Sequence, residues 1–169
     1  MKKIVITGKR NTEAILKPKK KIRSVVDISL NNELFDNKKQ IQWLNQLYLE
    51  EDYSDIKFAK REVERKIKSY KNQDIKKNKF DKKAFIEYDK CIEKLVVSKL
   101  KCYYCKESCL FMYENVREKK QWTLDRIDND IGHTSDNVVI CCLECNLKRG
   151  RLDDEKFKFT KQMKIIKKY

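Results

Sequence analysis

The clearest pattern of hydrophobic and polar positions lies in residues 54–71. Apolar side chains recur there every three or four residues, which is the spacing of one face of an α-helix. They are Ile56, Ala59, Val63, Ile67 and Tyr70. The intervening positions carry Lys, Arg and Glu. We therefore expect a helix that packs one face on a core and leaves the other solvated, with i,i+4 ion pairs such as Glu64–Lys68.

Two further segments show the same helical periodicity. Residues 36–51 place apolar side chains at Ile41, Leu44, Leu47 and Tyr48. Residues 81–99 place them at Ala84, Phe85, Tyr88, Ile92, Leu95 and Val96. The stretch 71–79 is polar throughout and predicts a connector. The chain thus predicts three helices, of which the last leads directly to Cys102.

A different pattern begins near residue 121. Residues 121–128 and 137–140 are short runs rich in apolar and β-branched side chains, which predicts two strands. Asn, Asp and Gly between them supply turn chemistry. A helix is expected to start near Cys142, so this segment predicts a ββα unit. Apolar runs at 4–6 and 24–30 are also compatible with short strands.

These elements predict an α+β fold, with a mainly helical, basic N-terminal region followed by a small ββα module. The composition changes near residue 100, so we expect a basic arm over 1–35, a helical region over 36–100 and the module with a C-terminal helix over 101–169. No apolar run reaches the ~18 residues of a membrane span. The N-terminus lacks a signal-peptide pattern. We therefore expect an intracellular protein with no membrane partner.

The net charge is +15, from 41 Lys and Arg against 26 Asp and Glu. A surface this basic attracts polyanions such as nucleic acid. Lys supplies most of this charge, which is also what an AT-rich coding sequence would produce, so charge counts only together with the motifs that follow. The basic cluster 17–23 fits a solvated linker or a phosphate-binding or nuclear-import tail.

Seven cysteines include two Cys-x-x-Cys pairs, Cys102 with Cys105 and Cys142 with Cys145. An odd number of cysteines in a reducing compartment indicates metal binding rather than disulfides. Two such turns complete a tetrahedral Cys₄ zinc site with no open position, so the zinc is expected to be structural. Two alternatives remain open: Cys141 in place of Cys142, and Cys109 in place of Cys105. Cys91 lies on the apolar stripe of the third helix and is expected in the core.

Asp125 falls late in the first expected strand, and Asn146 falls on the following helix. In a ββα unit the two face each other. A carboxylate and an amide oxygen suit Mg²⁺ or a similar cation, which keeps positions open for water and phosphate oxygens. Each residue also has a simpler interpretation, a turn-forming or salt-bridged aspartate and a helix-surface amide.

The region from Lys101 to Arg151 resembles the HNH, or ββα-metal, endonuclease module in its zinc-stapled form, common in phages and large DNA viruses. The motifs that carry the resemblance are the two Cys-x-x-Cys pairs, Leu-Asp-Arg-Ile-Asp, Asp-Asn-Val-Val and Cys-Asn-x-x-Arg-Gly, in that order. The resemblance implies that Asp125 and Asn146 are metal ligands, that Asn137 holds the hairpin loop in shape, and that the four cysteines form the zinc staple.

One position departs from the family pattern. The residue after the aspartate is usually His, the general base, and here it is Arg126. A guanidinium stays protonated and cannot accept a proton, although it can hold a phosphate. Three substitutes remain open: His133, which is the only histidine; Asp128; or a metal-bound hydroxide without a protein base.

The sequence therefore predicts a DNA endonuclease that uses Mg²⁺ or Mn²⁺ beside a structural Zn²⁺, and whose products, by resemblance, carry a 5′-phosphate and a 3′-hydroxyl. The expected phosphate contacts are Arg126, Lys148, Arg149 and Arg151. The alternative is a catalytically inactive, zinc-stapled protein that binds or packages DNA. The resemblance places either protein in the cytoplasm or nucleus of a host cell, or in a virion if the protein is viral.

Overall fold

The computed structural model describes residues 5, 7–9, 11–12, 36–51 and 56–164. The strands expected at 4–6 and 24–30 and the basic cluster 17–23 therefore lie wholly or partly outside the described residues. The elements, in chain order, are α2 (Asn37–Tyr48), α3 (Ile56–Lys76), α4 (Tyr88–Val97), β1 (Trp122–Arg126), β2 (Val138–Cys142), α5 (Leu143–Arg149) and α6 (Asp154–Gln162). This is the expected α+β order of a helical region, a hairpin and a following helix.

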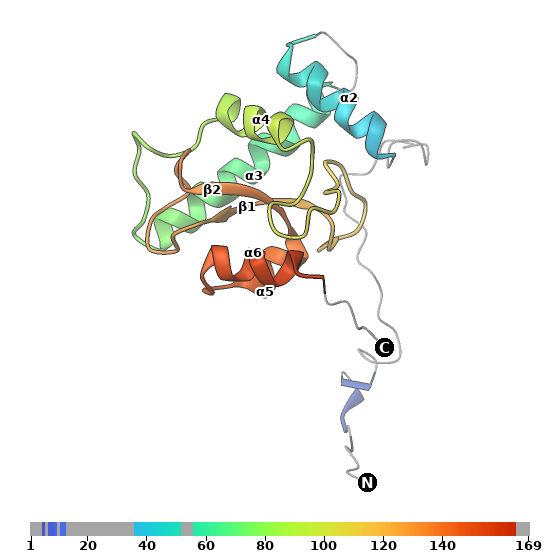
Figure 1. The fold of residues 1–169 in the computed structure, drawn as a ribbon, viewed down its shortest axis with the longest axis vertical. Helices are drawn as coiled ribbons and strands as arrows, with labels where there is room; N and C mark the ends of the chain where they lie inside the picture. The colour runs from blue at the N-terminus through green and yellow to red at the C-terminus, as the bar shows by residue number, and fades with distance from the viewer. Residues whose placement is uncertain (1–4, 6, 10, 13–35, 52–55, 165–169) are drawn as a thin grey trace.

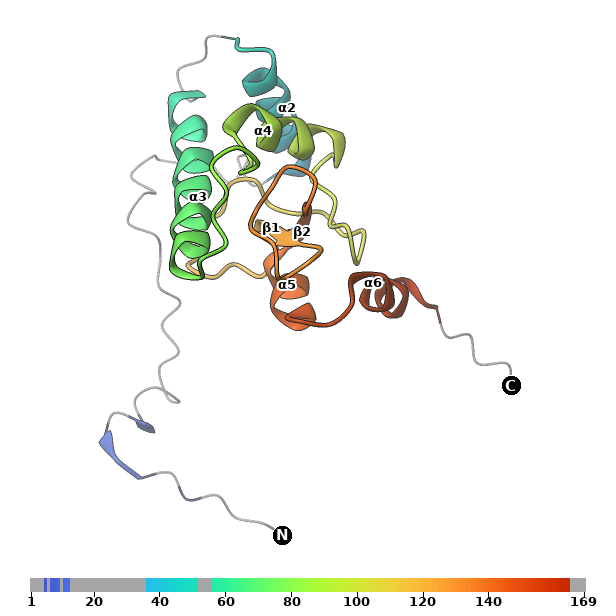
Figure 2. The ribbon, with the colours of Figure 1, turned by 90° about the vertical axis from the view of Figure 1, so that its left-hand side faces the viewer.

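The hairpin lies between two groups of helices. In Figures 1 and 2, α2, α3 and α4 lie on one side of β1 and β2, and α5 and α6 lie on the other. The strands pair antiparallel, with Trp122 opposite Cys142, Leu124 opposite Ile140 and Arg126 opposite Val138. Side chains alternate between the two faces of a strand. Thr123 and Asp125 accordingly share one face, which is the face that contacts α5.

The periodic segments form helices, but two of the expected boundaries were wrong. Helix α3 continues to Lys76, so most of the expected connector is helical. It contains no Pro or Gly, and Asp74 within it is buried against the hairpin loop. A polar side chain at that position therefore makes a tertiary contact that composition alone does not reveal.

The third helix begins at Tyr88 rather than near residue 81. Asp81 closes a turn instead: its Oδ1 accepts the Lys83 N–H at 2.8 Å, and its carbonyl accepts the Phe85 N–H at 2.9 Å. Phe85 then forms a β-bridge with Thr134. The Ile86 N–H donates to the carbonyl of His133 at 2.9 Å. Residues 81–84 thus form a turn, and residues 85–87 follow it as a short non-helical segment that supports the hairpin loop.

Short local contacts fix the C-terminal helices. Cys142 is the N-cap of α5, and its sulfur accepts the Cys145 N–H. Gly150 ends α5 with φ 54°, in the left-handed region that glycine adopts without strain. Asp153 caps α6 by accepting the Lys156 N–H at 2.9 Å. Phe157 of α6 packs edge-on against Tyr104.

One cluster of buried apolar residues includes side chains from both sides of the composition change near residue 100. It contains Leu44 of α2, Val63 of α3 and Leu95 of α4 together with Trp122 and Ile140 of the hairpin. Cys91 is also fully buried within it, as expected. The three helices thus form the support on which the hairpin packs. None of the described helices is long and apolar enough to cross a membrane.

Candidate metal centre and adjacent polar cleft

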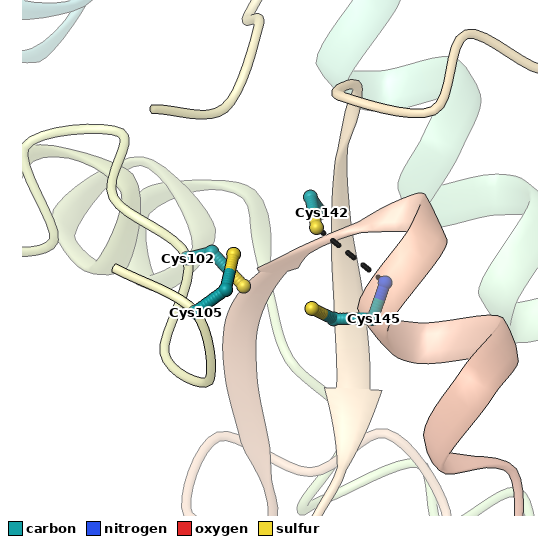
Figure 3. A group of neighbouring side chains, drawn as sticks. All are labelled: Cys102, Cys105, Cys142 and Cys145. Carbon is teal, nitrogen blue, oxygen red and sulfur yellow. Dashed lines mark hydrogen bonds between the residues drawn. The ribbon is translucent and has the colours of Figure 1, made fainter. Parts of the chain in front are cut away.

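Four cysteine side chains converge at one end of the hairpin. Cys102 and Cys105 come from the loop after α4, and Cys142 and Cys145 come from the end of β2 and the start of α5, with their sulfurs turned toward one another (Figure 3). All four sulfurs lie within 4.8 Å of one another. Four thiolates at ~2.3 Å from a tetrahedral zinc are ~3.8 Å apart, so the cluster needs little adjustment to hold the ion.

Backbone hydrogen bonds fix the first of the two cysteine turns. In the first, the Lys106 N–H donates to the Cys102 carbonyl at 3.0 Å and the Cys102 N–H donates to the Glu107 carbonyl at 2.9 Å. The Tyr103 N–H donates to the carbonyl of Ile140 at 2.9 Å, which ties this loop to β2. The cluster is therefore held at a fixed position relative to the hairpin by hydrogen bonds that do not involve sulfur.

The structure decides between the alternatives for the ligand set in favour of the two-residue spacings. Cys141 points to the opposite face from Cys142, where its sulfur lies 3.3 Å from the Thr123 hydroxyl. Cys109 is buried beside the cluster, and its hydrogen bond to Cys102 is the first of the contacts that lower the pKa of the Cys102 thiol. Burial raises the pKa of Cys145 to about 12, so a full set of thiolates requires the charge of a bound cation.

A polar cleft of ≈ 420 Å³ runs along the outer edge of β1, between α3 and α5. Leu124 directs both its backbone groups toward this edge: its N–H donates to the Tyr70 hydroxyl at 3.0 Å, and its carbonyl accepts from Asn146 Nδ2 at 3.4 Å. Side chains from two helices thus cover the strand edge. The cleft is lined by Asp125, Arg126, His133 and Asn146, by polar side chains of α3, and by cationic side chains from the loop after α3 and the chain after α5.

Asp125 is a buried carboxylate, only 6 % exposed, on the cleft wall. Its Oδ2 accepts the Tyr104 hydroxyl at 2.7 Å, and both oxygens accept from Arg149 Nη1 at 3.1 and 3.2 Å. Burial raises the pKa of Asp125 above its usual value, while Tyr104 and Arg149 act in the opposite direction. Asp125 is thus salt-bridged to Arg149, as the simpler interpretation of this residue expected, and it also lines the cleft.

Asn146 lies on α5 beside the same strand. Its Nδ2 donates to the Thr123 hydroxyl at 3.1 Å as well as to the Leu124 carbonyl. These bonds point the amide nitrogen at β1 and so turn the amide oxygen away from the strand. The structure therefore brings Asp125 and Asn146 to one cleft, as the ββα arrangement led us to expect.

His133 reaches this cleft from the hairpin loop, although it lies well apart from Asp125 in the sequence. Its ring packs against Tyr70 with centroids 4.7 Å apart. Its Nδ1 lies 2.8 Å from Asp74 Oδ1, and its backbone N–H donates to Asp74 Oδ2 at 2.7 Å. Of the three candidate bases, His133 lines the cleft, whereas Asp128 is exposed and its Oδ1 accepts the Asp130 N–H at 2.7 Å.

Asn137 makes the loop contacts that the resemblance implied. Its Oδ1 accepts the Asp128 N–H at 2.8 Å, and its Nδ2 donates to the carbonyls of Asp128 and Gly132 at 2.9 and 3.0 Å. Arg126 works on the same loop, since its Nη1 donates to the carbonyls of Asn129 and Ile131. Arg126 therefore both stabilises the hairpin loop and lines the cleft.

The expected phosphate contacts differ widely in position. Arg149 is 2 % exposed, with its guanidinium bonded to Asp125 and to the carbonyls of Arg126 and Ile127, so it is not placed to meet a phosphate. Lys148 is exposed, outside the cleft, and paired with Glu144 at 2.6 Å. Arg151 lines the cleft with an exposed side chain.

Several lining or supporting residues could not be assigned from the sequence. Tyr70 was assigned to the core, and Asp74, Lys77 and Lys79 were assigned to a polar connector. A helical continuation would have placed Tyr70 and Asp74 four residues apart on one face, together with Ile67. That spacing was the signal available, but a buried carboxylate cannot be told from a solvated one in sequence.

Comparison of the chain with protein-family models, with curated proteins and with solved structures found no match. What the geometry shows on its own is a ββα unit beside a four-cysteine cluster able to hold a structural zinc ion.

Proposed function

We propose that this protein is an HNH-like endonuclease that binds DNA and hydrolyses its phosphodiester bonds. The observation that carries the proposal is the meeting of Asp125, Asn146 and His133 on one cleft, at the strand edge of a ββα unit that carries the four-cysteine cluster. A metal-ligand pair and a candidate base are the groups that such hydrolysis requires. A protein that only binds DNA has no need of a buried carboxylate at that position.

The donor types in the cleft fit a divalent cation. Asp125 offers a carboxylate, and the amide oxygen of Asn146 is the group left over from its bonds to β1. When bound, Mg²⁺ or Mn²⁺ would stabilise negative charge on the phosphate and on the departing 3′ oxygen. Asp125 and Asn146 would hold the ion, and Tyr104 would keep the carboxylate in place.

Cationic side chains around the cleft supply attraction for a phosphate backbone. Lys77, Arg126 and Arg151 line it. Such contacts give affinity that depends on salt and is largely independent of base sequence. With a net charge of +15, we expect duplex DNA to be drawn to the protein before any base is recognised.

The test is nicking of supercoiled plasmid by purified protein in Mg²⁺ or Mn²⁺. Asp125→Asn keeps the shape of the side chain and an acceptor for Tyr104 but removes the charged ligand, so metal-dependent nicking should be lost. Asp136→Asn is the matched control, because Asp136 is exposed in the hairpin loop and does not line the cleft. Equal nicking by wild type and Asp125→Asn would refute the proposal.

A second candidate function is that of an inactive DNA-binding protein on the same scaffold. The ion pair between Asp125 and Arg149 favours it, because a cation already bonded to the carboxylate opposes a metal at the same oxygens. This alternative predicts a gel shift without nicking, unchanged by Asp125→Asn. The salt dependence of that shift would report the number of phosphates contacted.

A further inference from the structure

Asp74 and His133 form a buried pair that joins helix α3 to the hairpin loop. Asp74 is 1 % exposed, and its two oxygens accept two groups of the same residue: Oδ1 meets the ring Nδ1 at 2.8 Å, and Oδ2 meets the backbone N–H at 2.7 Å. Because Asp74 bonds to both the backbone and the ring of His133, it fixes the position of His133 and the rotation of its side chain.

The identity of the partner sets the tautomer. An ionised carboxylate can only accept hydrogen bonds, so the proton must lie on Nδ1 of His133. In the neutral ring the lone pair then lies on Nε2, on the side of the ring away from Asp74. His133 lines the cleft and Asp74 does not, so the side of the ring away from Asp74 is the one that borders the cleft.

The surrounding loop is built for close contact with α3. A side chain at Gly132 would overlap the Lys79 carbonyl and lie 3.0 Å from Asp74 Oδ2. Lys79 Nζ donates to the carbonyl of Asn129 at 2.5 Å. These contacts hold the loop close to α3 and the chain after it, and the Tyr70 ring packs against the imidazole.

We infer that Asp74 is a positioning residue that presents Nε2 of His133 to the cleft as the general base for hydrolysis. The inference rests on the proposed endonuclease function. It assigns the role of general base to His133, because Arg126 stays protonated and cannot accept a proton. Nε2 takes a proton from water while the water oxygen forms a bond to phosphorus. The bond from phosphorus to O3′ breaks, its electron pair goes to O3′, and O3′ takes a proton from solvent. The imidazolium then returns its proton to solvent.

The charges around the ring fit a base that is neutral near pH 7. The titratable and charged groups around it come from three places. They are Asp74 and Tyr70 of α3, Asp125 and Arg126 of β1, and, from the chain after α3 and after α5, Lys77, Lys79 and Arg151. Burial lowers the pKa of His133 below its usual value, Asp74 opposes this change, and Arg126 and Lys77 reinforce it. A lowered pKa keeps the ring able to accept a proton at neutral pH.

The presence of a single histidine allows a direct test that does not depend on activity. Tag-free, ¹⁵N-labelled protein gives ring NMR signals from His133 alone. We expect the Nδ1–H tautomer in the neutral wild type. Asp74→Asn should yield a mixture of tautomers and a further lowered pKa, because the negative charge that favours the protonated ring is removed. The Nε2–H tautomer in the wild type would overturn the inference, even if Asp74→Asn fails to fold.

Kinetics then test the catalytic step. His133→Gln should lower kcat for nicking by roughly 10²–10⁴-fold with little change in KM. Asp74→Asn should lower kcat less and move the acid limb of the kcat/KM profile down in pH, by the same amount as the NMR pKa of the free protein. Asp136→Asn again serves as control. A merely structural Asp74 would leave the position of that limb unchanged, and this outcome would overturn the inference.

The two failures are distinguishable. If His133→Gln nicks plasmid as fast as the wild type, His133 is not the general base, while the endonuclease proposal stands. Absence of nicking by zinc-loaded wild type refutes the endonuclease and, with it, the catalytic role of the pair.

Discussion

The four-cysteine cluster and the cleft lie on the same small hairpin but are assembled in opposite ways. The cluster takes four ligands of one kind from two short turns, and the spacing within each turn already brings its sulfurs together. The cleft takes different groups from α3, β1, the hairpin loop and α5. A site made of local turns is visible in sequence, whereas one made of distant elements exists only once the helices have packed.

The two regions also differ in how their buried ionisable side chains are stabilised. Burial raises the pKa of the Cys145 thiol, so four thiolates in the cluster depend on the charge of an ion from outside the chain. In and beside the cleft, the chain itself supplies the partners of its buried carboxylates: Asp125 pairs with Arg149, and Asp74 accepts hydrogen bonds from His133. Removal of the metal should therefore disrupt the four-cysteine cluster, while single substitutions of the paired residues should disrupt the cleft.

Loss of the zinc ligand set should have the largest effect. We expect one zinc per chain, and loss of zinc and of the folded hairpin in Cys145→Ser or after chelation. Zinc binding contributes roughly 10–16 kcal/mol to the folding of small zinc modules, more than a domain of this size can lose. Zinc content by mass spectrometry and circular dichroism with and without chelator measure this effect.

Cys109→Ser is the control for that experiment. Cys109 is fully buried next to Cys102 but lies outside the four-sulfur cluster, so the variant should keep one zinc per chain. If Cys109→Ser loses zinc and Cys105→Ser retains it, the ligand set is wrong.

Asp125→Ala should be the costliest single change in the cleft, at about 3–5 kcal/mol of unfolding free energy, because it leaves Arg149 charged and buried without its partner. Asp125→Ala combined with Arg149→Met should recover part of this loss, since no unpaired charge remains. Urea denaturation at fixed zinc concentration measures both. A loss below about 1 kcal/mol in the single variant would show that water reaches Arg149 and that the pair is not buried in solution.

A smaller effect is expected at the contact between the loop and α3. Gly132→Ala should cost about 1–3 kcal/mol, because the new methyl group meets backbone atoms that cannot move independently. It should also shift the ring resonances of His133. Gly150→Ala is the matched control: its φ of 54° is strained for alanine, but the nearest atom to the new Cβ is 4.0 Å away. That variant should lose stability without moving the His133 signals.

Particular residues show how far the sequence could be interpreted. The helical stripes through Leu44, Val63 and Leu95 were recognised because burial on one helix face repeats at a fixed interval. The extension of α3 to Lys76 was missed because its polar residues are held by a tertiary hydrogen bond through Asp74. Arg149 was assigned to phosphate because an arginine after a metal-site motif looks exposed until a buried carboxylate is found beside it.

The sequence by itself determined the order of elements, the ββα unit and the four cysteines, because each depends on spacing within a short segment. It placed Asp125 and Asn146 on facing elements for the same reason. Only the tertiary structure decided that Asp74 meets His133, that Arg149 is turned inward, and that the cleft has a wall from α3. Those outcomes depend on which faces of distant helices pack together, and no local pattern encodes that choice.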